Sequence, residues 1–126
     1  MEDRLNPIPS QEVDDTTLGG YSAVHGRAPA FEGIDGSAYT VAIETEPSES
    51  GDGGWVSYLV FVRWADGGTA IMGHLETEDV VSGDSQGEAR KAAEAIPLTR
   101  VKQILDQSIE RKRRWESEFS APEAEA

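Results

Sequence analysis

The stretch that decides the fold is WVSYLVFVRW, residues 55–64. It is rich in β-branched and aromatic side chains, and polar turn residues bound it on both sides, which is typical of a β-strand. Apolar side chains occupy both odd and even positions, and successive side chains of a strand point to opposite faces. Because both faces carry apolar bulk, we expect this strand to lie at the centre of a sheet.

Turn signals place further strands around this central one. Asp35-Gly36 and Asp66-Gly67 are two-residue hairpin signals, because a type I′ turn needs positive φ at both central positions. The polar loop 47–54 is rich in Gly and Ser and connects the second strand to the central one. The pattern predicts strands at about 28–33, 38–46, 55–64 and 69–77, joined as an antiparallel meander.

The turns also predict a register, which decides the face on which each side chain lies. We expect Trp64 opposite Thr69. We also expect Glu46 opposite Trp55. One face then collects most of the bulk and should be the core: Tyr39, Val41, Ile43, Tyr58, Val60, Val62, Trp64, Ile71 and Leu75. The second face collects Phe31, Thr40, Ala42, Leu59, Phe61, Arg63, Ala70, Met72, His74 and Glu76.

Two helices follow the strands. Ser85 and Glu88 have the spacing of a capping box, so a helix should begin after Ser85 and end before Pro97. A second helix should begin near Leu98 or Thr99. Its stripe at helical spacing is Val101, Ile104, Leu105, Ile109, Lys112, Trp115 and Phe119. The sequence thus predicts an α+β fold, a four-stranded antiparallel β-meander with two C-terminal helices packed on one face.

The chain is short enough for one domain, with 126 residues. Residues 1–20 are polar and lack periodicity, which predicts a disordered N-terminal arm. Residues 21–119 should form the single α+β domain, and 120–126 a disordered acidic tail. No apolar run is long enough for a membrane helix and no signal peptide is visible, so we expect a cytoplasmic protein with no membrane partner.

Charge and composition exclude several classes of function. Twenty-four acidic residues against eleven basic ones give a net charge of −13. Residues 1–89 carry −14, whereas 90–114 carry +5. Because so acidic a body repels phosphate, we expect no nucleic-acid partner despite the basic run 111–114. The chain has no cysteine and no metal-ligand motif, so we expect no metal and no cofactor.

One group of polar residues suggests a small-ligand site. His74 and Glu76 lie two apart on a predicted strand, so their side chains share a face. With Glu44 on a nearby strand, they could form a carboxylate–imidazole cluster for a metal or for general acid–base work, with Arg63 beside it. Alternatively, they are polar residues near the rim of an exposed face. The other histidine, His25, falls in a loop that the sequence does not place.

The apolar second face suggests a protein interface. Its candidate contact residues are Phe31, Leu59, Phe61 and Met72, and the second helix adds Trp115 and Phe119. Exposed apolar patches often mark protein–protein contacts. Alternatively, segment 21–27, with Tyr21 and Val24, folds across this face. We expect a non-enzymatic accessory or interaction module whose partner is another protein or a second copy in a homodimer. The alternative is a small-ligand-binding protein or modest enzyme at His74, Glu76, Glu44 and Arg63.

Overall fold

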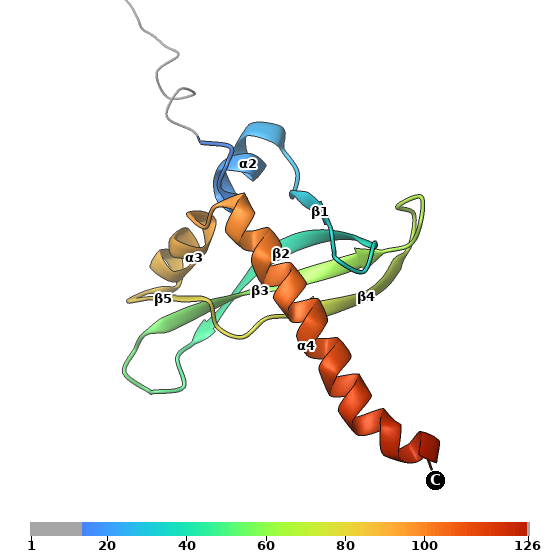
Figure 1. Cartoon of the computed structure of the whole chain (residues 1–126). Coiled ribbons are helices and arrows are strands. Elements are labelled where there is room, and N and C mark those ends of the chain that lie inside the picture. The colour runs from blue at the N-terminus through green and yellow to red at the C-terminus, as the bar shows by residue number, and fades with distance from the viewer. Residues whose placement is uncertain (1–13, 126) are drawn as a thin grey trace, which may run out of the picture.

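A computed structural model describes residues 14–125 of the chain, and the side chains of residues 14–118 (Figure 1). The helices are α2 (Leu18–His25), α3 (Gln86–Glu94) and α4 (Leu98–Glu125). The strands are β1 (Ala30–Glu32), β2 (Ala38–Pro47), β3 (Trp55–Trp64), β4 (Ile71–Glu76) and β5 (Val81–Gly83).

The five strands form one antiparallel sheet, and the fold is α+β as predicted. Strands β1, β2, β3 and β4 lie side by side in chain order, which confirms the meander. Strand β3 is central, and its first residues pair with the short β5, which the sequence analysis did not include. The residues that α2 and α4 contribute to the hydrophobic core all pack with one face of β2 and β3. We call this side the inner face and the opposite side the outer face.

The register between β2 and β3 differs from the predicted one by a single residue. Trp55 pairs with Pro47, not with Glu46, and Ser48 N–H donates to Gly54 O at 2.9 Å to close the loop. A slip of one residue moves every side chain of a strand to the other face. Tyr39, Val41 and Ile43 of β2 stay on the core face as predicted. On β3, the residues predicted on the core face lie on the opposite face, and those predicted on the opposite face lie in the core.

Leu59 and Phe61 are therefore core residues, and their predicted place on an exposed face is wrong. Both are fully buried and belong to the same core cluster as Leu105 of α4. The rest of that cluster is Leu18, Tyr39, Val41, Val101, Ile104 and Ile109. The inner face is thus built from the half of β3 that we had assigned to the outside.

Both hairpin loops are longer than the two residues predicted. Gly33 N–H donates to Ser37 O, which leaves three residues in the first loop and sets Phe31 opposite Tyr39 on the inner face. Ala65 N–H donates to Ala70 O, which leaves four residues in the second. Strand β4 then contains a β-bulge, since Trp64 pairs with Ile71 but Arg63 pairs with Gly73. Ile71, predicted to be in the core, is 63% exposed.

The C-terminal helices begin where the sequence analysis placed them. Ser85 Oγ accepts a hydrogen bond from Glu88 N–H at 3.2 Å, and Glu88 in turn accepts from Asp84 N–H. This completes the capping arrangement, and α3 buries Ala89 and Ala93 against the sheet. Helix α4 crosses the sheet and continues beyond β4 (Figure 1). Its backbone remains helical to Glu125, so the tail expected from residue 120 is helix instead.

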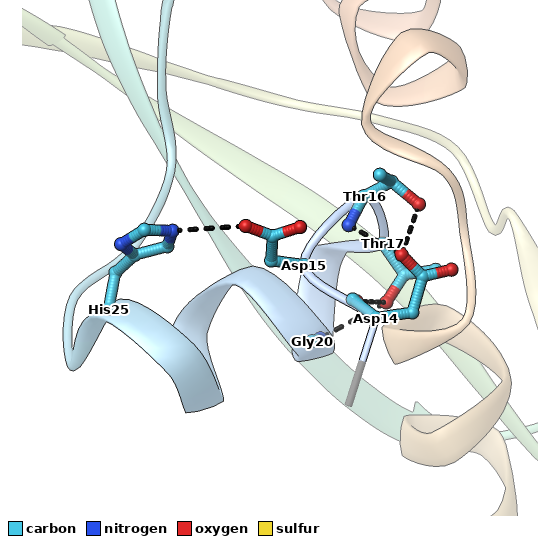
Figure 2. Close-up of polar contacts among 6 residues, drawn as sticks. All are labelled: Asp14, Asp15, Thr16, Thr17, Gly20 and His25. Atoms are coloured by element: carbon cyan, nitrogen blue, oxygen red, sulfur yellow. Dashed lines mark hydrogen bonds and ion pairs between the residues drawn. The ribbon is translucent and has the colours of Figure 1, made fainter. Parts of the chain in front are cut away.

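The N-terminal boundary of the fold lies before residue 20. Figure 2 shows how the start of α2 is held: Asp14 accepts from Thr16 N–H at 2.9 Å, and Thr17 Oγ1 caps the helix by accepting from Gly20 N–H at 3.1 Å. Leu18 is buried in the core, so the predicted start of the domain at residue 21 is too late. Residues 1–13 of the expected arm lie outside the described residues.

Helix α2 also settles the position of segment 21–27. Its His25 ends the helix and lies 3.4 Å from Asp15 (Figure 2). Tyr21 contacts the His25 ring, and the Arg27 guanidinium lies over Tyr21 at 5.3 Å from the ring centroid. The segment therefore folds on itself beside α3 and does not cover the outer face of the sheet.

Candidate functional site

The four residues predicted to form a ligand site lie on opposite faces of the sheet. His74 and Glu76 project from the outer face of β4, with 3.6 Å between Nε2 and Oε2. Glu44 is also on the outer face, opposite Tyr58. Arg63 projects from the inner face, where its Nε donates to Ser37 Oγ at 3.0 Å. The expected four-residue cluster is therefore not formed.

The outer face carries an apolar ladder that the sequence analysis had assigned to the core. The side chains of Tyr58, Val60, Val62 and Trp64 follow one another along β3, and each is half-buried. Trp64 Nε1 donates to Thr40 Oγ1 at 3.0 Å, so the indole lies against β2. Within the described residues, the core-forming side chains of the helices all lie on the other side of the sheet.

Acidic residues lie beside this ladder at its Tyr58 end. Glu44 and Glu46 lie on β2, and Glu76 lies on β4 opposite Val60. Burial raises the pKa of the Tyr58 phenol, and the negative charges of Glu76, Glu46 and Glu44 raise it further. In the register of the sheet, Glu44 lies opposite Tyr58, Glu46 opposite Val56 and Glu76 opposite Val60. The outer face therefore combines an apolar centre with the carboxylates of Glu44, Glu46 and Glu76, which we call the acidic rim.

The predicted interface residues do not form one surface. Leu59 and Phe61 are core residues, and Phe31 packs partly buried against the core. Met72, at the bulge of β4, is 56% exposed, and Trp115 on α4 is 61% exposed. The side chain of Phe119 lies outside the described side chains. Of the six residues, Met72 and Trp115 are thus the exposed ones among the described side chains.

A pocket of about 230 Å³ lies on the inner side, where α4 passes over the edge of the sheet. Arg63 and His74 both border it, together with Lys112 and Arg113 of α4. At its inner end the Tyr39 hydroxyl donates to Asp35 at 2.7 Å. Burial raises the pKa of Tyr39 to about 12, and this hydrogen bond raises it as well.

The Asp35 carboxylate is held in its charged form. Burial by itself would raise the pKa of Asp35, but hydrogen bonds from the Tyr39 hydroxyl and Ser37 N–H, with the charge of Arg63, lower it overall. Asp35 and Tyr39 thus form a fixed polar pair at the wall of the pocket. A phenol that stays protonated to about pH 12 is a hydrogen-bond donor and not a base at neutral pH.

Sequence reasoning missed the two features that now define the candidate sites. The ladder on β3 was visible as apolar bulk on both faces of residues 55–64, but only the register shows which half remains uncovered. Lys112 was included in the helical stripe, and Arg113 in the basic run. Their approach to Arg63 depends on the angle at which α4 crosses the sheet, which no local pattern encodes.

Neither a metal site nor a membrane-spanning helix is found among the described residues, and no relative points to a further site. In the described part of the chain, no three His, Asp or Glu side chains gather closely enough to hold a metal ion. None of the described helices combines the length and apolarity that crossing a membrane requires. Comparisons with protein-family models, with curated proteins and with solved structures found no match.

Proposed function

We propose that this chain is a non-enzymatic protein-interaction module that associates with a second copy of itself through the outer face of its sheet. The observation that supports the proposal is the apolar ladder of Val60, Val62 and Trp64, which stays partly exposed at the centre of that face. A sheet with an apolar face is normally covered by a second layer. Here the helices of the described chain form a layer on the inner face only.

The second copy offers a segment with the complementary chemistry. Residues 111–118 of α4, which we call the α4 extension, are all exposed, and Arg111 lies 3.8 Å from Glu78 of the same chain. The extension contains the basic run 111–114 and the exposed indole of Trp115. Basic side chains around an aromatic anchor match an apolar ladder with an acidic rim. Aromatic and arginine residues are also those that most often dominate the energy of protein contacts.

Charge favours this arrangement over a face-to-face one. Two outer faces packed together would bring two acidic rims, each with Glu44 and Glu76, into contact at a repulsive cost. Packing the α4 extension of one copy on the outer face of the other pairs opposite charges. A two-fold axis repeats this contact, so that each copy supplies one face and one helix.

The dimensions also agree. The α4 extension has eight residues, which in a helix span about 12 Å. Strands in a sheet are about 4.8 Å apart, so β2, β3 and β4 together cover about 10 Å between their outer axes. Helix α4 leaves its own sheet past β4 (Figure 1). A second sheet placed beside β4 with its outer face turned toward the helix would therefore receive the extension.

The test is the oligomeric state of two matched variants. Val62→Glu places a carboxylate in the ladder, between Thr40 and His74 of the neighbouring strands, whereas Val24→Glu makes the same change on α2, where Val24 is 50% exposed. Sedimentation velocity over a wide range of protein concentration should show a monomer–dimer equilibrium for the wild type and for Val24→Glu. Val62→Glu should weaken dimerisation by about 30-fold or more, equivalent to about 2 kcal/mol.

Two further measurements, circular dichroism and the salt dependence of dimerisation, complete the experiment. Circular dichroism should show that Val62→Glu keeps the native fold, because its side chain points away from the core. Added salt should weaken the wild-type dimer, since charges at the edge of a contact are screened. A wild type that stays monomeric at every concentration would overturn the proposal, as would equal dimerisation by the two variants.

A further inference from the structure

The pocket on the inner side combines basic residues from two elements that are distant in the sequence. Arg63 comes from the end of β3, and Lys112 and Arg113 come from the point at which α4 passes the edge of the sheet. Three of the eleven basic residues of the chain thus border one cavity of about 230 Å³. In a chain with a net charge of −13, this concentration of positive charge is not explained by composition.

The positive groups are only partly neutralised by neighbouring carboxylates. Lys112 forms no ion pair among the described residues, and Arg113 Nη1 lies 3.8 Å from Glu110. Arg63 uses its Nε to reach Ser37. Two acidic residues, Asp35 and Glu116, also border the pocket. Asp35 already accepts two hydrogen bonds from the protein, which occupy part of its capacity.

The two guanidinium groups act on the same point inside the pocket. The positive charges of Arg63 and Arg113 both oppose the rise in the pKa of Tyr39 that burial and Asp35 cause. Arg63, Arg113 and Tyr39 all line this one cavity. Leu75 and Ile109 supply an apolar wall. A site with convergent cations and an apolar wall is suited to a short aliphatic molecule with an anionic group.

We propose that this pocket binds a small aliphatic molecule through an anionic oxygen group, a carboxylate or a phosphate, held by Arg63, Lys112 and Arg113. A guanidinium presents paired N–H donors whose geometry matches both groups, and Lys112 adds a point charge. A cavity of about 230 Å³ suits a compact metabolite. The site lies on the inner side of the sheet, and two of its residues, Lys112 and Arg113, also belong to the α4 extension of the proposed dimer.

The probes for the test are inorganic phosphate and succinate, titrated separately into the full chain by calorimetry at low salt. Arg63→Gln and Lys112→Gln remove one charge each from the pocket. Arg100→Gln removes one charge from the same helix outside the pocket, where the Arg100 side chain contacts Gln103. Each pocket variant should bind the preferred probe at least about 10-fold more weakly than the wild type does, because hydrogen bonds to charged groups are stronger than those between neutral groups.

The comparison of probes and variants decides the outcome. Tighter binding of phosphate indicates a phosphorylated ligand, and tighter binding of succinate indicates a carboxylate; either supports the site if Arg100→Gln binds like the wild type. Equal loss in all three variants would show a general effect of net charge and overturn the proposal. Failure of both probes to bind the wild type below about 10 mM would overturn it as well.

Discussion

Neighbouring residues of β3 provide the sharpest test of the register, because Phe61 and Val62 lie on opposite faces. Phe61 is fully buried in the core cluster, whereas Val62 is half-buried on the outer face. Phe61→Ala leaves a cavity among well-packed side chains and should cost about 3–5 kcal/mol. Val62→Ala removes two methyl groups worth about 0.8 kcal/mol each when fully buried, so at half burial it should cost about 1 kcal/mol or less.

Urea unfolding followed by circular dichroism measures both costs. The protein is kept dilute, because a dimer that buries Val62 would add its own stability to the measurement. The free energy of unfolding of a domain is about 5–15 kcal/mol, so Phe61→Ala should remove a large part of it, with an unchanged m-value. Phe61→Glu should unfold the domain outright, since it buries an unpaired carboxylate. A larger cost for Val62→Ala than for Phe61→Ala would refute the register described above.

Two further outcomes follow from the packing of β5 and from the polar pair in the pocket. A Cβ on Gly83 would lie 2.5 Å from Ala89 N, so Gly83→Ala should destabilise the domain by about 1–3 kcal/mol. Gly87→Ala adds a Cβ that meets open space within α3, so it should stabilise the domain by up to about 1 kcal/mol. Thermal unfolding compares the two variants, and equal effects would contradict the packing of α3 on β5. Because the pKa of Tyr39 is raised to about 12, its protonated form stabilises the fold fully below pH ~10 and this contribution is lost as the pH rises toward 12. An ultraviolet titration of the tyrosines should show one ionisation near pH 12 that Tyr39→Phe removes, and its persistence in that variant would refute the assignment.

Local patterns located the secondary structure well but not the lengths of the turns. The central strand 55–64 was predicted with the bounds that the structure has, and β2 differs by one residue at its end. Asp-Gly pairs correctly marked both hairpins. However, the same dipeptide fits loops of two, three or four residues, and Gly68 beside Gly67 supplies a second left-handed position that allows the longer loop.

Hydrophobicity could not correct the register, because β3 is apolar on both faces. Ser57 carries the information that separates them. It lies on the inner face, and its hydroxyl donates to Ala89 O at 2.6 Å, so its small side chain lets α3 approach the sheet. In the predicted register the large Tyr58 would occupy that layer instead. Bulk alone favoured Tyr58, whereas the close packing of Ala89 and Ala93 requires a small partner.

The candidate site was only partly predictable for a related reason. Arg63 and His74 border one pocket without Glu44 and Glu76, and they come from opposite faces of the sheet because the bulge at Met72 changes the alternation of β4. The basic run 111–114 was interpreted as a solvated helix end, and all four of its residues are exposed. Its approach to Arg63 is a tertiary property, since it depends on α4 crossing β3 and β4.

Helix α4 links the two proposals through its division into a buried and an exposed half. In its first half, the apolar residues Val101, Leu105 and Ile109 are buried in the core. Beyond Ile109 the same stripe continues with Lys112 and Trp115, so the helix carries charge and an aromatic ring past the edge of its own sheet. A basic side chain that lies beside a cavity can bind a small anion, and a basic side chain that lies beyond the sheet can bind an acidic surface. Since the Debye length at physiological salt is about 8 Å, both interactions should weaken in salt, but only dimerisation should respond to Val24 and Val62 differently.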